Sequence, residues 1–203
     1  MLHGISIGVS AGERVALVGK SGAGKSTLLS VLQGRYGANT ALVPQDPGLV
    51  RGLSVFHNVY MGGLHRHGTA YNLLNLIWPQ AKALAEVRPI VERLGLGDKL
   101  FERTGELSGG QQQRTAICRA LVQGGDAILA DEPVSAADNH QSRAILDAIT
   151  ETFPTVVLAM HDVDLALEYS TRIIGIKDAG IALDAPAAEL TRPDLDFLYA
   201  DPS

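Results

Sequence analysis

Short apolar runs alternate with segments of helical periodicity over most of this chain. Residues 14–19 (RVALVG) form a mostly apolar run that stops at a glycine, and such runs are typical of strands buried on both faces of a sheet. The predicted strands of this kind are residues 14–19, 40–44, 127–130 and 155–160. Residues 172–177 and 181–184 predict a closing hairpin. Because helical segments follow the strands, as at residues 26–34, the pattern predicts a parallel sheet with helices on its faces.

The middle of the chain, residues 53–125, contains no convincing strand-like run. Its apolar residues recur at helical spacing, as at Val87 and Val91. Pro89 interrupts this pattern and predicts that a new helix starts there. We therefore expect a single domain, residues 1–203, with a helical subdomain inserted into a core. The expected limits are about 1–50 and 124–203 for the core and about 51–123 for the helical subdomain.

Composition narrows the function classes. The chain carries 17 Lys and Arg against 22 Asp and Glu, a net charge of −5, which argues against a general nucleic-acid binder. A single cysteine, Cys118, excludes an intrachain disulfide framework and fits a reducing cytosolic setting, and we expect it to be a small core residue. We see no signal-peptide pattern, and the apolar runs are far shorter than the roughly 20 residues of a membrane helix. We therefore do not expect the chain to cross a membrane.

The clearest chemical motif is the glycine-rich segment GKSGAGKST, residues 19–27. It matches the phosphate-loop pattern G-x-x-x-x-G-K-[ST] at every fixed position, between a predicted strand and a predicted helix. Glycines let the backbone wrap a phosphate, and the N–H groups at the start of a helix attract the anion. We expect Lys25 to reach the β- and γ-phosphates, Ser26 to bind Mg²⁺ and Thr27 to lie beside the α-phosphate. The predicted nucleotide-binding residues of this loop are Gly19, Lys20, Ser21, Gly22, Ala23, Gly24, Lys25, Ser26 and Thr27.

Acidic and polar side chains stand at the ends of three predicted strands, at the sheet edge where ligands bind. Asp131 and Glu132 are the two acids of ILADEP, at the carboxyl end of a buried strand; Gln45 follows TALVP, and His161 follows TVVLAM. We expect Asp131 and Gln45 to hold Mg²⁺ together with Ser26. Glu132 is expected to act as general base toward the attacking water. His161 is expected to hydrogen-bond the γ-phosphate or to orient that water.

A second candidate anion site is LSGGQQQR, residues 107–114. Ser108 and Gln111 form the S-x-x-Q pattern of a capping box, which explains a helix start. The capping pattern does not explain Gly109 and Gly110, since each glycine costs a helix about 1 kcal/mol. An anion that approaches the backbone closely would explain both glycines. Because the first loop already holds the phosphates of its own nucleotide, we infer that this segment serves a nucleotide bound to a second copy of the chain. Two chains, head to tail, would then sandwich two nucleotides.

Taken together, these motifs resemble those of the ATP-binding cassette (ABC) family. LSGGQQQR looks like its signature motif, GKSGAGKST like its Walker A, and ILADEP like its Walker B with the glutamate; VPQD is similar to its Q-loop, SAAD to its D-loop and MHD to its H-loop. The order and rough spacing match over nearly the whole chain. The resemblance implies an α/β P-loop NTPase (RecA-like) core with a mostly parallel sheet and an inserted helical subdomain, with ATP and Mg²⁺ as cofactors.

The same resemblance implies partners and a location. It implies the ATPase subunit of a membrane transporter, peripheral to the cytoplasmic face of the cell membrane. It also implies that ATP closes the dimer, that hydrolysis opens it, and that helices of transmembrane permease subunits ride in a groove between the core and the helical subdomain near Gln45. Ser135 and Asp138 form a capping pattern at a helix start, and Asp138 could also meet the partner chain.

A narrower resemblance concerns the cargo. Residues 53–79 (LSVFHNVYMGGLHRHGTAYNLLNLIWP), with the signature and Walker B segments, look like the ATPase subunits of phosphonate importers. The implied cargo is phosphonate or a related phosphorus oxyanion. An extracytoplasmic solute-binding protein and the permease would choose it, because the ATP chemistry does not read the cargo.

Two departures from the family pattern concern its antiparallel β-subdomain. Family members usually carry an adenine-stacking aromatic residue on a strand well before Walker A, and Met1, Leu2 and His3 begin too late for that strand. The stretch between Thr27 and Gln45 is also shorter than usual. We therefore expect this subdomain to be trimmed at two places, with nucleotide affinity or base selectivity affected.

Two alternatives differ from a transport ATPase. A chromosome-maintenance or repair ATPase of the same superfamily needs long coiled-coil heptads between Gln45 and Leu107, and this stretch is too short and has no sustained heptad. A non-hydrolysing or regulatory nucleotide-binding module would fit the trimmed regions, but Glu132 and His161 argue against it. Measuring turnover distinguishes this module from the ATPase.

Overall fold

The computed structural model describes residues 5–35 and 39–200, which form two compact units. A sheet unit comprises residues up to Gln45, Gly125–Ser135 and the chain from Phe153; a helical unit comprises Asp46–Gly124 and Ala136–Thr152. The domain limits expected from the sequence stay a prediction. The compact units differ from them mainly at residues 136–152, and also at 46–50 and 124, all of which belong to the helical unit. Met1, Leu2 and His3, which bear on the adenine-stacking strand, lie outside the described residues.

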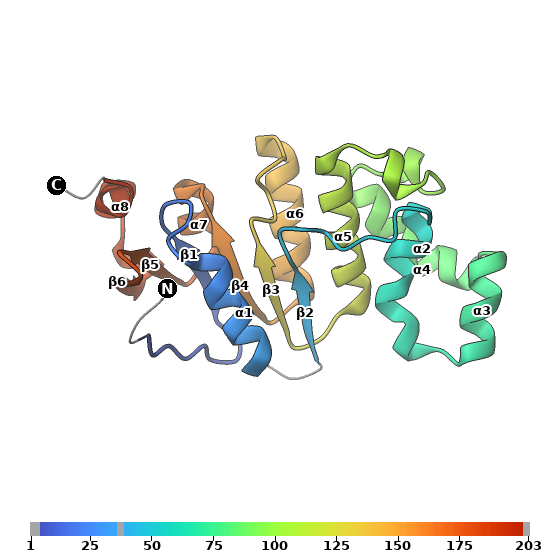
Figure 1. The fold of residues 1–203 in the computed structure, drawn as a ribbon, viewed down its shortest axis with the longest axis horizontal. Helices are drawn as coiled ribbons and strands as arrows, with labels where there is room; N and C mark the ends of the chain where they lie inside the picture. The colour runs from blue at the N-terminus through green and yellow to red at the C-terminus, as the bar shows by residue number, and fades with distance from the viewer. Residues whose placement is uncertain (1–4, 36–38, 201–203) are drawn as a thin grey trace. The chain divides into compact units, whose positions relative to one another are not determined.

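The sheet unit is built on one sheet with the strand order β2-β3-β4-β1-β5-β6 (Figure 1). The neighbouring pairs from β2 to β5 are parallel, and β5 with β6 is antiparallel. The strands are β1 (Arg14–Val18), β2 (Thr40–Val43), β3 (Ala127–Asp131), β4 (Thr155–Met160), β5 (Arg172–Lys177) and β6 (Gly180–Pro186). The helices of this unit are α1 (Lys25–Arg35), α7 (Val163–Tyr169) and α8 (Arg192–Leu195), with the 3₁₀ turns η4 (Ala187–Glu189) and η5 (Asp196–Leu198). The α/β fold with a mostly parallel sheet is therefore confirmed.

The register of the central strands brings their carboxyl ends together. Val18 of β1 pairs with Met160 of β4, and Asp131 of β3 pairs with Ala159 of β4. Both faces of these strands are buried, which explains why they read as continuous apolar runs rather than alternating ones. The residues that follow these strands therefore meet at one edge of the sheet.

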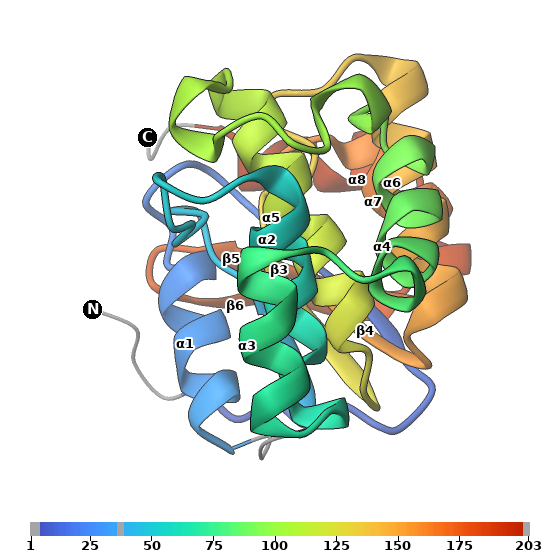
Figure 2. The ribbon, with the colours of Figure 1, turned by 90° about the vertical axis from the view of Figure 1, so that its right-hand side faces the viewer.

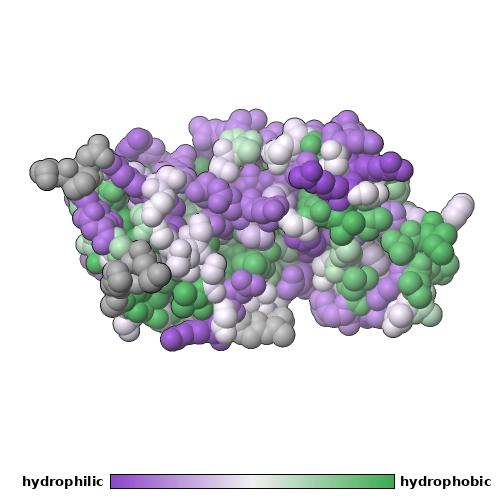
Figure 3. Space-filling model, in the orientation of Figure 1, coloured by the Kyte–Doolittle hydropathy of each residue, from purple (hydrophilic) through white to green (hydrophobic). Residues whose placement is uncertain are grey.

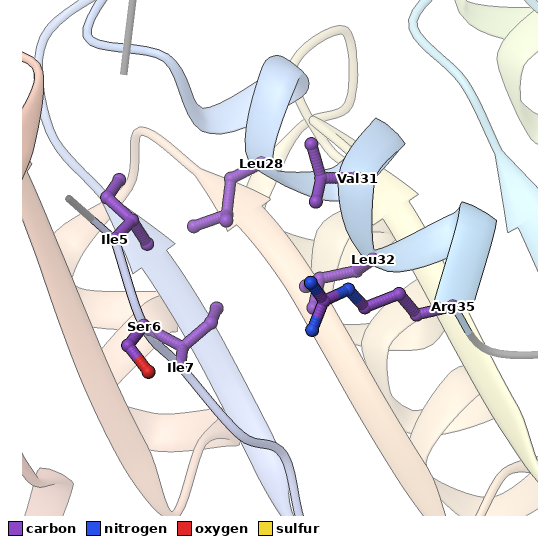
Figure 4. Close-up of a pocket in the computed structure, with 7 residues that line it drawn as sticks. All are labelled: Ile5, Ser6, Ile7, Leu28, Val31, Leu32 and Arg35. Carbon is purple, nitrogen blue, oxygen red and sulfur yellow. The ribbon is translucent and has the colours of Figure 1, made fainter. Parts of the chain in front are cut away.

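The antiparallel part of the sheet unit is small. Within the described ranges, the named strands that pair antiparallel are β5 and β6, and Arg35 and Thr40 stand at the two ends of a short connection from α1 to β2. A groove of about 390 Å³ lies between residues 5–7 and α1, and Figure 4 shows Ile5 and Leu28 on its two walls. The groove is lined by Ile5, Ser6, Ile7, Leu28, Val31, Leu32 and Arg35. The expected trimming of the antiparallel β-subdomain stays a prediction, because one of its two places concerns residues 1–3, which lie outside the described ranges.

The helical unit is organised around α5, which packs against α2, α4 and α6 (Figure 2). Its helices are α2 (Val55–Tyr60), α3 (Thr69–Ile77), α4 (Ala81–Arg93), α5 (Gly109–Gln123) and α6 (Asn139–Thr152), with the 3₁₀ turns η1 (Met61–Arg66), η2 (Gly97–Lys99) and η3 (Thr104–Glu106). Cys118 of α5 is buried, as expected for a core residue.

Apolar side chains that include Ile77 and Trp78, at 83% and 72% exposed, gather over the end of α3 at the right of Figure 3.

The predicted helix start at Pro89 is wrong. Pro89 lies inside α4, which continues through it to Arg93. Ala83, Val87 and Val91 are all buried on one side of this helix. Burial of this apolar face keeps the helix continuous across a residue that lacks a backbone N–H, so packing outweighs the local cost of the proline.

In the part of the chain that the structure describes, no helix is both long and apolar enough to cross a membrane.

Candidate functional site

The phosphate loop lies between the end of β1 and the start of α1. Gly19, Gly22 and Gly24 have φ values of +148°, +79° and +109°, a region that residues with a Cβ rarely adopt. A Cβ on Gly19 would also lie 2.3 Å from the carbonyl oxygen of Ile176 in β5. The glycines are therefore required by the backbone path of the loop itself.

Lys25, the first residue of α1, is held inside the loop. Its side chain is buried, and its Nζ donates hydrogen bonds to the carbonyl oxygens of Gly19 (2.7 Å) and Lys20 (3.1 Å). Burial lowers the pKa of Lys25, while the nearby carboxylates of Glu132 and Asp131 act in the opposite direction. A buried cation thus stands at the helix start, where the backbone N–H groups of α1 also favour an anion.

A cavity of about 270 Å³ opens over this loop, and its lining comes from residues of the sheet unit. It is lined by Ser21, Gly22, Gly24, Lys25, Ser26, Thr27, Gln45 and Glu132. The structure thus brings Gln45 and Glu132, which the sequence places at two strand ends, to the loop. Gly19, Lys20 and Ala23 of the predicted set belong to the same loop but do not line the cavity.

The oxygen donors at this edge suit a divalent cation. Asp131 is 6% exposed, and its Oδ1 has no hydrogen-bond partner among the residues that the structure describes. Ser26 and Gln45 line the neighbouring cavity and offer a hydroxyl and an amide oxygen. Hydroxyl, amide and carboxylate oxygens are the ligands that Mg²⁺ prefers, so the residues present fit this ion.

Glu132 and His161 form a hydrogen-bonded pair. Nε2 of His161 lies 2.6 Å from Oε1 of Glu132. Glu132 has a φ of +52°, and its backbone N–H donates to the carbonyl oxygen of Ala159 (3.0 Å). The N–H and the hydroxyl of Ser135 both donate to the carbonyl oxygen of Glu132, at 3.2 Å and 3.1 Å. These bonds hold Glu132 in a left-handed conformation that a residue with a side chain rarely adopts.

Sequence reasoning missed both the His161–Glu132 contact and the role of Ser135. The positive φ of Glu132 leaves no mark in the residue types around it, so the sequence carried no signal for this geometry. The position of Ser135, a small polar residue three places after the acid, was the available signal for its contact. The sequence pattern instead predicts a helix start at this residue.

The signature segment forms a helix start in the helical unit. Ser108 is the N-cap of α5: its Oγ accepts from the N–H of Gln111 (3.3 Å), and Oε1 of Gln111 accepts from the N–H of Ser108 (3.0 Å). The predicted capping box is therefore confirmed. A Cβ on Gly110 would lie 3.1 Å from the carbonyl oxygen of Ala136, whereas Gly109 has nothing within 4 Å. Gly110 is thus explained by packing within this chain, and Gly109 faces open space.

The predicted helix start at Ser135 is wrong. Asp138 immediately precedes α6, and its Oδ1 accepts from the N–H of Gln141 (2.8 Å), while its carbonyl accepts from the N–H of Ser142 (2.8 Å). The carboxylate of Asp138 therefore caps the helix. The hydroxyl of Ser135 does not, because it is already bonded to the carbonyl oxygen of Glu132. Asp138 and residues 108–111 belong to the helical unit and do not line the cavity over the phosphate loop.

Comparison with known proteins agrees with these features. The model of the ABC transporter family matches residues 2–40 and 35–135 of this chain. The phosphonates import ATP-binding protein PhnC 1 of Pseudomonas savastanoi pv. phaseolicola is 39% identical over 229 residues, covering 98% of this chain and 86% of that protein. The phosphonates import ATP-binding protein PhnC of Pseudomonas putida is 38% identical, covering 98% and 84%.

The way these sequences match also locates the shortening. The family match breaks at residues 35–40, where α1 ends and β2 begins. The alignment with the first relative spans 229 positions, although it covers only 98% of the 203 residues of this chain. Relatives of this kind therefore carry additional residues within the matched region.

Solved structures support the same fold. A dimeric ATP-binding cassette in a post-hydrolysis state, bound to ADP and Pi, matches with a TM-score of 0.74 at 25% identity, over 92% of this chain and 90% of that one. A dimeric bacterial ABC transporter cassette matches with a TM-score of 0.77 at 23% identity, over the same shares. With the phosphate loop, the strand-end acids and the signature helix in place, this chain belongs to the ABC transporter family, whose ATP-binding subunits are ATPases.

Proposed function

We propose that this chain binds ATP with Mg²⁺ and hydrolyses it to drive the import of phosphonate or a related phosphorus oxyanion. The observation that carries the ATPase is the Glu132–His161 pair, whose carboxylate lines the same cavity as the phosphate loop. The cargo rests on the relatives, which are named as phosphonates import ATP-binding proteins.

Binding rests on the loop and the helix behind it. The backbone N–H groups of residues 21–26 wrap the β- and γ-phosphates, and the dipole of α1 adds to their attraction. Lys25 leaves its two carbonyl partners and meets the γ-phosphate, because a phosphate anion offsets the buried cation better than neutral carbonyl groups do. Thr27 lies beside the α-phosphate.

Three side chains would hold the metal ion. Ser26 and Gln45 would bind Mg²⁺, supported by Asp131, whose buried Oδ1 has no partner in the described part of the chain. Mg²⁺, when bound, supplies positive charge that neutralises the charge developing on the transferring phosphoryl group.

Hydrolysis rests on Glu132 as general base. Its carboxylate takes a proton from the water that attacks the γ-phosphate in line, and the water oxygen forms the new bond as the bond to the β-phosphate oxygen breaks. Nε2 of His161 holds Oε1 of Glu132 at 2.6 Å and positions the carboxylate for this step. The rest of the acceleration comes from positioning and charge stabilisation.

The site is completed by a second copy of the chain. Ser108, Gly109, Gly110 and Gln111 of that copy face the γ-phosphate, and its Asp138 meets the shared interface. The open space at Gly109 supports this role, since an anion can approach the start of α5 there. The matching cassette with ADP and Pi is a dimer, which supports two chains per assembly.

The helical unit offers a surface for the permease. An apolar groove of about 370 Å³ is lined by Leu53, His57, Tyr60, Met61, Leu64, Thr69, Asn72, Leu73 and Leu76. Exposed leucines in such a groove suit an apolar helix of a transmembrane partner. The chain would then sit peripherally on the cytoplasmic face of the membrane, with an extracytoplasmic solute-binding protein delivering the cargo.

The test uses the purified chain and its Glu132→Gln variant. Wild type should release phosphate from ATP in the presence of Mg²⁺, and Glu132→Gln should bind ATP, release almost none and accumulate as a dimer on size exclusion. The second candidate, a non-hydrolysing module, predicts tight ATP binding with no phosphate release by wild type. Wild-type turnover in Glu132→Gln would contradict the role of the glutamate.

A further inference from the structure

The C-terminal segment of the sheet unit, which includes η5 and Tyr199, packs on β5 beside the phosphate loop. Leu198 of η5 is 1% exposed. It fills the space over Gly175, where a Cβ would lie 2.7 Å and 2.8 Å from the two Cδ atoms of Leu198. A larger residue at Gly175 would displace this side chain, so the glycine makes the seat for the segment.

Among three consecutive residues of β5, two face this segment and the one between them faces the loop. Gly175 receives Leu198, and Nζ of Lys177 donates to the carbonyl oxygen of Phe197 (2.9 Å). Between them, the carbonyl oxygen of Ile176 faces Gly19, the first residue of the phosphate loop. A Cβ on Gly19 would lie 2.3 Å from this oxygen. The position of the C-terminal segment and the path of Gly19 are therefore set by the same short stretch of strand.

Tyr199, the next residue after η5, brings a polar atom to this place. Its hydroxyl is buried and has no hydrogen-bond partner within the described ranges. Burial raises the pKa of Tyr199, and the backbone N–H of Gly19 opposes that rise. The Gly19 N–H is therefore the candidate donor for this hydroxyl, since buried hydroxyls in proteins are nearly always bonded.

We propose that Tyr199 is a positioning residue of the ATP site, whose hydroxyl accepts a hydrogen bond from the Gly19 N–H when the loop closes on a triphosphate. The inference rests on the proposed ATP-binding function. Lys25 now holds the carbonyl of Gly19 at 2.7 Å. When its ammonium group turns to the phosphates, Gly19 is released from that bond and can adjust toward Tyr199.

This role predicts a particular pattern of effects. The proposed bond joins Tyr199 to the loop and not to the reacting atoms, so the hydroxyl contributes to the affinity for ATP rather than to the rate of the chemical step. Because the hydroxyl has no partner in this structure, its removal should not weaken the fold. A merely structural tyrosine would instead lose stability and affinity together.

The experiment compares Tyr199→Phe with Tyr71→Phe. Tyr71, in α3 of the helical unit, carries the same kind of hydroxyl, which is buried and without a partner in the described part of the chain. Equilibrium binding of ATP with Mg²⁺, steady-state kinetics and thermal melting are measured for wild type and both variants. Tyr199→Phe should weaken ATP affinity about fivefold, the scale of one net hydrogen bond. KM should rise by the same factor, while kcat and Tm should stay unchanged. Tyr71→Phe should change none of these quantities.

The possible results separate the two proposals. Wild-type affinity in Tyr199→Phe would overturn the role of Tyr199 while leaving the ATPase intact, and so would an equal loss of affinity in Tyr71→Phe. A wild-type chain that binds no ATP would overturn the proposed function, and this inference with it. Leu198→Ala, assayed at temperatures where circular dichroism shows it folded, should weaken ATP affinity as well, because it unseats Tyr199.

Discussion

Nε2 of His161 lies 2.6 Å from Oε1 of Glu132, and the two residues come from the ends of adjacent strands. The pair joins the residue after β4 to the residue after β3, so the proposed general base is held where two neighbouring strands end. The phosphate loop follows β1 at the same edge of the sheet. β1 pairs with β4 on the side opposite to β3. The chemistry of this chain therefore depends on three neighbouring strands.

His161→Ala should lose turnover while keeping ATP. The variant removes the imidazole that contacts Oε1 of Glu132, so the carboxylate loses a group that positions it toward the attacking water. We expect kcat to fall about 10²-fold or more, the range of a lost general base. Affinity for ATP should change little, because His161 does not line the cavity over the loop. Phosphate release and ATP binding are measured in parallel. His65→Ala, which removes an exposed histidine of η1, is the control and should behave as wild type.

Lys25→Ala should abolish tight binding of ATP. The variant removes the one ammonium group in the cavity lining, and it leaves the carbonyl groups of Gly19 and Lys20 without this donor. We expect an affinity loss of about 100-fold or more, since a charge-assisted bond to phosphate contributes about 1.5–3 kcal/mol and the loop also loses its internal hydrogen bonds. Equilibrium dialysis with labelled ATP measures it. Affinity within about threefold of wild type would contradict the assignment of the loop.

Gly109→Ala separates folding from assembly. Nothing lies within 4 Å of a Cβ at Gly109, and alanine favours a helix over glycine by about 1 kcal/mol, so Tm should be unchanged or higher. If a second chain brings a γ-phosphate to this helix start, the added methyl group should reduce MgATP turnover and ATP-dependent dimerisation.

Gly110→Ala provides the contrast for this prediction. Its Cβ would lie 3.1 Å from the carbonyl oxygen of Ala136, so a lower Tm is expected. Normal turnover and dimerisation in Gly109→Ala would show that no partner approaches the backbone there.

Cys118 makes stability depend on pH in the alkaline range. Burial raises the pKa of its thiol from 9.0 to about 12, so the neutral thiol is favoured in the folded chain. The resulting stabilisation is complete below the pKa of the unfolded chain and is lost as pH rises toward 12. Over this window the free energy of unfolding should fall by up to about 1.4 kcal/mol per pH unit from this group.

The measurement for Cys118 is a difference between two proteins. Urea unfolding of wild type and Cys118→Ala at several pH values from 8 to 11 isolates the thiol, because all other groups titrate in both. The loss of stability with pH should be smaller in Cys118→Ala. Parallel curves for the two proteins would show that the thiol titrates normally in the fold.

The sequence predicted the sheet and the loop well, because both depend on local patterns. Buried parallel strands require apolar runs, and a phosphate loop requires glycines at positions with positive φ, as at Gly19 and Gly24. The capping box at Ser108 and Gln111 is equally local, since both bonds join residues three apart.

The features that could not be predicted depend on contacts distant in sequence. Pro89 stays within a helix because the buried face of α4 is packed, and Ser135 is withdrawn from capping by its bond to Glu132. The pairing of Glu132 with His161 joins residues 29 apart, which no spacing rule covers. Tyr199 belongs to none of the sequence motifs, and its position relative to the loop depends on how the C-terminal segment packs on β5.

The central claim, that two chains share each ATP site, is tested most directly by the ATPase rate as a function of protein concentration. The purified chain is assayed with saturating MgATP over a concentration range that spans dimerisation. The account predicts that phosphate release per chain rises with concentration and reaches a plateau when dimers form, since Ser108 and Gly109 of one chain complete the site of the other. A rate per chain that is independent of concentration, in protein that is monomeric throughout the range, would contradict it.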